Sequence, residues 1–224
     1  MTVATKLMPP PLLEQLFQLA GGITVEGLSK KQFSELTSLY PDLQMEREKN
    51  GKINIMSPVK GGSGIREVKL SRRIGNWCEA NIGGEVFSPS TGFNLPDGST
   101  KSPDVAWLST DKMETLTADE IENHYIPAVP DFIVELRSKS DKLSVVKRKM
   151  EKTWIANGVE LAWLIDPYKE KVYIYRADGS TDTVTGFDNK LSGESVLEGF
   201  ELDLSEFKVF KKKGSLTNPV KKIK

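Results

Sequence analysis

The stretch 130-PDFIVELR-137 decides how the chain is expected to fold. Its middle part, Phe132 to Leu136, is a compact apolar run, which is typical of a central strand that is covered on both faces. Because side chains alternate along a strand, Glu135 and Arg137 are expected on the same side of the sheet. The stretch therefore predicts a buried strand with charged groups at its C-terminal end.

The segments on either side of this strand alternate between helix and strand patterns. A helix that Ser140-Asp141 can cap and a second buried strand follow it. A long helix, closed by Gly83-Gly84, and several short strands precede it. The predicted core elements are strands at 85–88, 92–95, 104–108, 132–136 and 161–165, and helices at 65–82 and 140–156. This order predicts an α/β fold in which helices flank one mixed sheet, with short strands near 182–197 extending that sheet.

The N-terminal part predicts a helical and hairpin extension of this core. Four leucines between residues 11 and 19 share one helical stripe, and Ser29 can cap a second helix that runs to about Tyr40. Two strands, at 43–47 and 52–56, are joined through Asn50-Gly51, a common hairpin turn. The expected organisation is a helical extension at 1–40, a main domain at 41–207 and a basic tail at 208–224.

The composition excludes several kinds of catalytic site. The chain has one histidine, His124, and one cysteine, Cys78. A zinc site rich in histidine is therefore excluded, and a Ser-His-Asp triad would have to use His124. Cys78 falls with Val68, Ile74 and Trp77 on the apolar, inward side of the 65–82 helix, which predicts a core cysteine rather than a nucleophile. Any metal ion must be held mainly by carboxylates.

The hydropathy pattern offers no candidate for a membrane segment. The longest apolar stretches are far shorter than the roughly 18 residues that a membrane helix needs. Pro9-Pro10-Pro11 interrupts the N-terminus, where a secretory signal would keep an unbroken apolar core. A single cysteine fits a reducing compartment. These features predict a cytoplasmic protein without a membrane partner.

Charge is balanced overall but uneven along the chain. The 31 basic and 31 acidic residues cancel, yet no acidic residue follows Glu206, whereas seven lysines do. The tail can be an arm that contacts phosphate backbones or an acidic partner. The alternative is a solvated end of the chain, which is favoured on general grounds.

Two carboxylates stand where strand ends can converge. Asp104 opens one predicted strand, and Glu135 lies near the end of another, 31 residues later. If the two strands are neighbours, the carboxylates meet at a sheet edge and suit Mg²⁺, which proteins usually hold through one or two carboxylates. In the alternative, Glu135 and Arg137 form a local ion pair and Asp104 caps a turn. Spacing alone favours that alternative.

Several short motifs follow one another in a fixed order between about Phe33 and Phe207. They are Met45-Glu46-Arg47 with Gly51, Ser90-Thr91-Gly92-Phe93 with Leu95 and Gly98, Ser102-Pro103-Asp104, Pro130-Asp131-Phe132-Ile133-Val134-Glu135, Arg137-Ser138, Ser140-Asp141, Lys149-Met150, Asn157-Gly158 and Trp163-Leu164-Ile165-Asp166-Pro167. This ordered set resembles the putative restriction endonuclease family within the PD-(D/E)XK nuclease superfamily. The resemblance implies a restriction endonuclease-like mixed sheet flanked by helices.

The resemblance also implies a metal site and its ligands. Asp104 and Glu135 are the expected ligands of Mg²⁺ or Mn²⁺. Glu46 and Glu67 are further acidic candidates, although a structural role is favoured for each. The third position of the superfamily's E-x-K triplet is Arg137 here, and the branch that this chain resembles uses a lysine of the next helix instead, matched by Lys149.

The helical pattern is compatible with that role for Lys149. Leu143, Val146, Met150 and Trp154 form the stripe expected to pack on the sheet, and Lys149 lies at its margin. Its long stem can cross apolar surface while the ammonium reaches the strand edge. Lys147 and Lys152 are expected to point elsewhere.

Taken together, the resemblance implies a Mg²⁺-dependent DNA endonuclease that hydrolyses phosphodiester bonds in double-stranded DNA. Cutting both strands of a duplex favours a homodimer. One alternative is a catalytically degenerate protein with the same fold, which binds nucleic acid or has a regulatory role. The other is a structural protein whose carboxylates are ion-paired.

Overall fold

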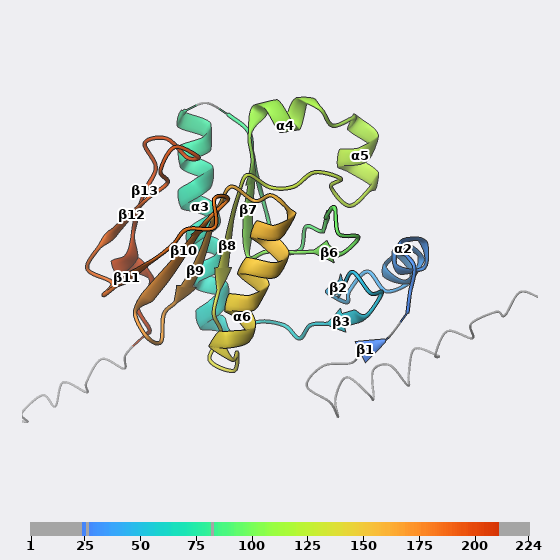
Figure 1. The fold of residues 1–224 in the computed structure, drawn as a ribbon, viewed down its shortest axis with the longest axis horizontal. Helices are drawn as coiled ribbons and strands as arrows, with labels where there is room; N and C mark the ends of the chain where they lie inside the picture. Colours follow the sequence, from blue (N-terminus) through green and yellow to red (C-terminus); the bar gives the residue numbers. More distant parts are fainter. Residues whose placement is uncertain (1–23, 26, 82, 211–224) are drawn as a thin grey trace, which may run out of the picture.

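The computed structural model describes residues 24–25, 27–81 and 83–210 (Figure 1). The helix expected at 11–19 and the tail lysines from Lys211 onward lie outside the described residues. Within the described part, no helix is both long and apolar enough to cross a bilayer.

A six-stranded mixed sheet forms the centre of the fold. Its strands lie in the order β11 (Thr181–Thr185), β10 (Lys171–Arg176), β9 (Leu161–Asp166), β8 (Phe132–Leu136), β7 (Val105–Leu108) and β4 (Glu85–Phe87). The β8 and β9 strands are parallel, and every other neighbouring pair is antiparallel. The apolar run of β8 is buried because strands flank it on both edges and helices cover both faces, as expected from 130–137.

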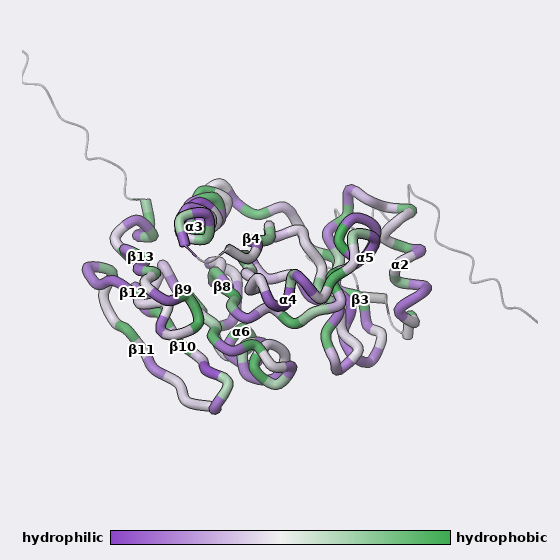
Figure 2. Tube along the Cα trace, turned by 90° about the horizontal axis from the view of Figure 1, so that it is seen from above, coloured by the Kyte–Doolittle hydropathy of each residue, from purple (hydrophilic) through white to green (hydrophobic). Residues whose placement is uncertain are grey.

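Helices pack on opposite faces of this sheet. On one face lies α3 (Gly61–Ala80), whose Leu70 and Ile74 join one core cluster with Phe132 and Val134. On the other face lie α6 (Leu143–Lys149) and the π-helical turn η1 (Met150–Trp154), in a second cluster with Ile133. Figure 2 shows α3 and α6 on either side of β8. The alternation of side chains along one strand thus supplies both cores.

A second sheet stands beside the first, where one sheet was expected. Its strands lie in the order β1 (Thr24–Val25), β3 (Ile53–Ile55), β2 (Met45–Arg47), β6 (Thr100–Lys101) and β5 (Phe93–Asn94). The helix α2 (Lys30–Leu39), capped by Ser29 as predicted, buries Phe33 and Leu36 against this sheet. The predicted hairpin of β2 and β3 is confirmed. Strands of two residues have too few positions to show a period, so β1 and β6 left no pattern in the sequence.

The C-terminal strands also differ from expectation. The β12 (Lys190–Ser192) and β13 (Glu201–Asp203) strands pair with each other and do not extend the central sheet, whereas β11 does. A 3₁₀ turn, η3 (Leu204–Phe207), follows β13. Two short helices, α4 (Thr110–Glu114) and α5 (Ala118–Asn123), lie between β7 and β8.

Two details of the helices correct the sequence-based expectations. The α3 helix begins at Gly61 rather than near 65, and Val68, expected to point inward, is 68% exposed. The α6 helix begins after Lys142, whose side chain makes no capping bond, so Ser140-Asp141 is not its cap. The chain then continues through η1 and a 3₁₀ turn, η2 (Ile155–Asn157), and Gly158 closes it at a φ of +103°.

Candidate active site

Asp104 and Glu135 stand opposite each other at the end of two adjacent strands. The antiparallel register of β7 and β8 ends with Val105 opposite Val134. Asp104 and Glu135 are the next residues beyond this pair, and their charges interact. Directly opposed residues point to the same face with Cβ atoms about 5 Å apart. The N–H of Leu136 also donates to Oδ2 of Asp104, at 2.5 Å. The prediction that the two strands are neighbours is confirmed.

The surroundings of Asp104 disfavour its negative charge. Burial raises the pKa of its carboxyl group well above the ordinary value, and the charges of Glu135 and Glu67 add to that rise. The N–H of Leu136 and the ammonium of Lys149 act in the opposite direction. Like charges gathered in a partly desolvated place indicate a site that gains from a further cation.

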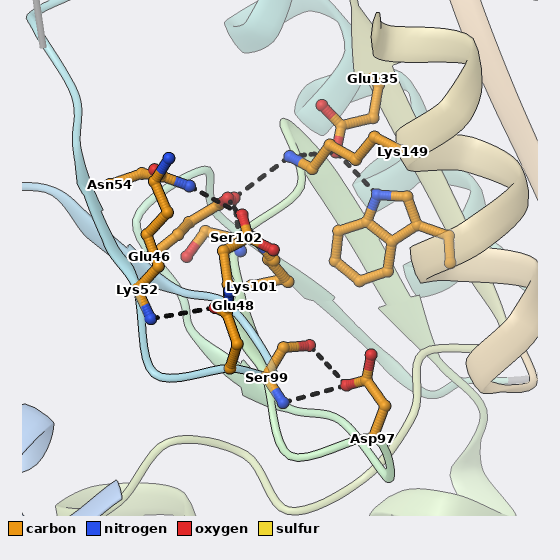
Figure 3. Close-up of polar contacts among 12 residues, drawn as sticks. Glu46, Glu48, Lys52, Asn54, Asp97, Ser99, Lys101, Ser102, Glu135 and Lys149 are labelled. Atoms are coloured by element: carbon orange, nitrogen blue, oxygen red, sulfur yellow. Dashed lines mark hydrogen bonds and ion pairs between the residues drawn. The ribbon is translucent and has the colours of Figure 1, made fainter. Parts of the chain in front are cut away.

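Lys149 supplies one cation to this place. Its Nζ lies 2.8 Å from Oε1 of Glu135 and 3.1 Å from Oε1 of Glu46, and its side chain is 25% exposed (Figure 3). Burial alone would lower the pKa of Lys149, but its pairs with Glu135 and Glu46 outweigh this effect and raise that pKa. The indole N–H of Trp154 donates to the same Oε1 of Glu135, at 2.8 Å.

The neighbouring lysines of the same helical segment point elsewhere, as predicted, but Lys147 lies against an aromatic ring where both were expected mostly in water. Nζ of Lys147 lies 3.7 Å from the ring centroid of Tyr173, a cation–π contact. Lys152 is exposed. The margin position of Lys149 is therefore what directs its ammonium to the carboxylates.

Glu46 approaches from the second sheet and belongs to the same cluster. Its carboxylate is buried, accepts the N–H of Ser102 at Oε1 and pairs with Lys101 through Oε2, at 3.1 Å. Burial would raise the pKa of Glu46, but the pairs with Lys149 and Lys101 lower it overall. Sequence reasoning missed Lys101. Only its position directly before the Ser102-Pro103-Asp104 motif could have drawn notice to it.

A family comparison now bears on this arrangement. The model of the Uma2 family, described as "Putative restriction endonuclease", matches residues 31–205. The chain belongs to this family. Membership supports a nuclease activity, and therefore a nucleic-acid substrate, for this chain.

Structural comparison supports the same fold. A crystal structure of a "putative nuclease belonging to DUF820" from Anabaena variabilis ATCC 29413 has 18% sequence identity to this chain and a TM-score of 0.66. The match covers 81% of this chain and 97% of that one. The fold predicted for a restriction endonuclease-like protein is thereby confirmed. No curated protein matches the chain.

Arg137, which stands at the third triplet position, pairs with a carboxylate other than Glu135. Its guanidinium pairs with the fully buried Asp166 of β9, at 2.9 Å, and donates to the carbonyl of Asp141. The alternative of a local Glu135–Arg137 pair is therefore wrong. Asp141 binds locally too, because its Oδ2 accepts the N–H of Ser138.

Glu67 lies on α3, close enough to Asp104 for the two charges to interact. Burial raises its pKa, and its charge contributes to the raised pKa of Asp104. Across the described ranges, however, no three side chains of histidine, cysteine, aspartate and glutamate gather to hold a metal ion. A role for Glu67 or Glu46 as a third ligand stays a prediction.

The pair of Asp104 and Glu135 nevertheless fits a hard divalent cation, which restriction endonuclease-like nucleases generally use. Among the contacts of the described residues, Asp104 is engaged through Oδ2 and Glu135 through Oε1. Oδ1 and Oε2 are left for a ligand. Two carboxylate oxygens completed by water are a ligand set that Mg²⁺ accepts.

A cavity of about 760 Å³ lies elsewhere, between α2 and α5. Met45 and Ser102, which are next to Glu46 and Lys101 in the sequence, line this cavity. Glu46, Asp104, Glu135 and Lys149 do not line it. The carboxylate pair therefore sits at a strand edge and not inside this cavity.

Proposed function

We propose that this protein is a Mg²⁺-dependent endodeoxyribonuclease, with Mn²⁺ as a substitute ion. The observation that carries the proposal is that Asp104 and Glu135 lie next to the last residue pair of β7 and β8, with the ammonium of Lys149 2.8 Å from Glu135. Membership of the Uma2 family supports the wider class, a hydrolase acting on nucleic acid.

Asp104 and Glu135 hold the cation in this proposal. Bound there, it would act as a Lewis acid on the scissile phosphate and lower the pKa of an attacking water. A divalent charge bound there would favour the ionised form of Asp104. It would thereby offset the burial and the repulsion that raise the pKa of this carboxyl group.

Lys149 is the residue proposed to touch the substrate. Two of its three N–H bonds point to Glu135 and Glu46, which leaves one for a phosphoryl oxygen. A fixed ammonium stabilises the negative charge that develops on that oxygen as the bond breaks. Its raised pKa keeps it protonated, so it acts through charge and not as a base.

Arg137 is proposed as a second source of positive charge near the site. A guanidinium stays protonated and cannot act as a base. Its pair with Asp166 neutralises part of its charge and holds the end of β8 against β9. Its share in catalysis is therefore proposed to be smaller than that of Lys149.

Double-stranded DNA is the proposed substrate, cut by a homodimer that presents one site to each strand. The test is incubation of supercoiled plasmid, single-stranded DNA and RNA with Mg²⁺ or Mn²⁺. Linear product formed without accumulation of nicked circles would indicate that both strands are cut in one binding event. Asp104→Asn and Glu135→Gln should each abolish cleavage, and Lys52→Met is the control.

The alternative is a degenerate module that binds nucleic acid without cutting it. The observation in its favour is that Arg137 and Lys149, the two candidate cations of the active site, are already paired with carboxylates. DNA binding by the wild type with no product in either metal, and no metal binding that depends on Asp104, would establish this alternative.

A further inference from the structure

A series of ion pairs with alternating charges connects the second sheet to Glu135 in the central sheet. Lys101 of β6 contacts Glu46 of β2 at 3.1 Å. Glu46 contacts Lys149 of α6 at 3.1 Å, and Lys149 contacts Glu135 of β8 at 2.8 Å. Figure 3 shows the labelled side chains of this series converging from the second sheet toward the central one.

Lys101 occupies an unusual place for a lysine. Its side chain is only 3% exposed, and its ammonium contacts Glu46 and Glu48, the second at 2.5 Å. Buried ammonium groups are costly unless they are paired, and replacing a buried ion pair by apolar side chains is often neutral or stabilising. Stability alone therefore gives little reason for a lysine here. A directional constraint on Glu46 gives a better one.

That constraint follows from how the two oxygens of Glu46 are divided. Oε2 faces Lys101, while Oε1 accepts the N–H of Ser102 and faces Lys149. A carboxylate held at one oxygen can rotate about its last torsion, which is broad. A carboxylate held at both oxygens cannot, so Lys101 keeps Oε1 directed at Lys149.

Lys149 in turn needs such a support. Its side chain is long and flexible, and Glu135 alone would hold it at one point. With Glu46 as the second anchor, the direction of its remaining N–H is set. Partners behind the groups that touch a substrate commonly matter because they orient those groups.

We propose that Lys101 is a positioning residue, which acts through Glu46 to fix the ammonium of Lys149 beside the carboxylate pair. This inference rests on the proposed function, in which Lys149 touches the scissile phosphate and Lys101 does not. It assigns Glu46 to the support of Lys149 and not to a metal ion.

The first test is kinetic. Lys101→Met keeps the length of the side chain and removes its charge, so kcat for plasmid cleavage should fall about 10- to 100-fold with KM unchanged. Lys101→Arg, which can still pair with Glu46, should recover most of the loss. In a Lys149→Met background, Lys101→Met should have no further effect, because it acts only through Lys149.

The second test does not depend on activity. Limited reductive methylation, read by peptide mass spectrometry, reports how freely each ammonium is exposed. Lys101→Met should raise the labelling of Lys149 several-fold relative to the exposed Lys152. Lys52→Met, a change at a half-buried lysine just before β3, should leave it unchanged. If Lys101→Met does not fold, Glu46→Gln should raise the labelling of Lys149 in the same way.

The outcomes distinguish failure of the proposed nuclease function from failure of the positioning role of Lys101. A wild type that cleaves no nucleic acid would overturn the proposed function, while labelling would still decide the positioning role. Equal labelling of Lys149 in the wild type and in both variants would overturn the inference. So would independent, additive losses of kcat in the Lys101→Met/Lys149→Met protein.

Discussion

Asp104→Asn should make the metal-free protein more stable and remove its response to metal. Replacing a carboxylate by an amide of the same shape removes the repulsion between Asp104 and Glu135. For charges about 5 Å apart at an effective dielectric constant near 20, that repulsion is about 3 kcal/mol. The amide oxygen still accepts the N–H of Leu136, but the loss of charge weakens this bond by about 1 kcal/mol.

The expected net gain is therefore about 2 kcal/mol, which raises Tm by about 4–8 °C in a chain of 224 residues. The pH dependence of stability comes first from the burial of the Asp104 carboxyl group and then from the same repulsion. Because the folded-state pKa of Asp104 is raised, the folded chain binds more protons than the unfolded chain. Metal-free stability should thus rise as pH falls from the raised pKa toward the ordinary one, and Asp104→Asn should lose this slope.

With a divalent cation present, the wild type should be more stable than Asp104→Asn. At a concentration 100 times its Kd, a cation bound only by the folded wild type adds about 2.7 kcal/mol, or roughly 5–11 °C in Tm. Differential scanning fluorimetry with EDTA and with Mn²⁺ measures both effects. Asp42→Asn, at an exposed carboxylate, is the control. An Asp104→Asn protein that is less stable without metal, or that gains as much from Mn²⁺ as the wild type, would refute the reasoning.

Three further predictions concern the charged residues around this pair. Lys149→Met should lower turnover about 10²-fold or more, as loss of one transition-state donor does, while Lys147→Met changes little in the same plasmid assay. Arg137→Met leaves Asp166 buried without its cation and should cost about 3–5 kcal/mol in urea unfolding; a loss of activity at unchanged stability would contradict this. If the tail contacts phosphates, truncation after Phe210 removes six lysines and should weaken DNA binding and flatten its salt dependence. Unchanged affinity and slope would make the tail a solvated end.

Much of the central sheet could be predicted from local patterns. The runs that became β8 and β9 hold three and five consecutive apolar residues, and such runs can be recognised without knowing the partner strand. The second sheet could not be found as a separate sheet in this way, although its hairpin and the strand that contains β5 were predicted. The β1 and β6 strands are two residues long and join the sheet through β3 and β2, which are distant in sequence. Val68 was misplaced because α3 is covered along only part of its circumference.

Some residues of the candidate site could likewise be proposed from local sequence patterns, and others could not. Asp104, Glu135 and Lys149 could be proposed from motif order and helical position, and the structure brings the three together. Lys101 could not be proposed, because whether a lysine is buried depends on a carboxylate 55 residues earlier in the chain. Charge on its own predicts exposure, and only the matching partner changes that.

The sequence by itself therefore determined the apolar strands, the helix that presents Lys149 and the two carboxylates at strand ends, because periodicity and local spacing carry that information. The tertiary structure decided which charges pair. By strand period, Arg137 belongs on the side of Glu135, yet its guanidinium pairs with Asp166 across the parallel β8–β9 register. Ion pairs form between groups that chain folding brings within a few ångströms, and no local pattern encodes that distance.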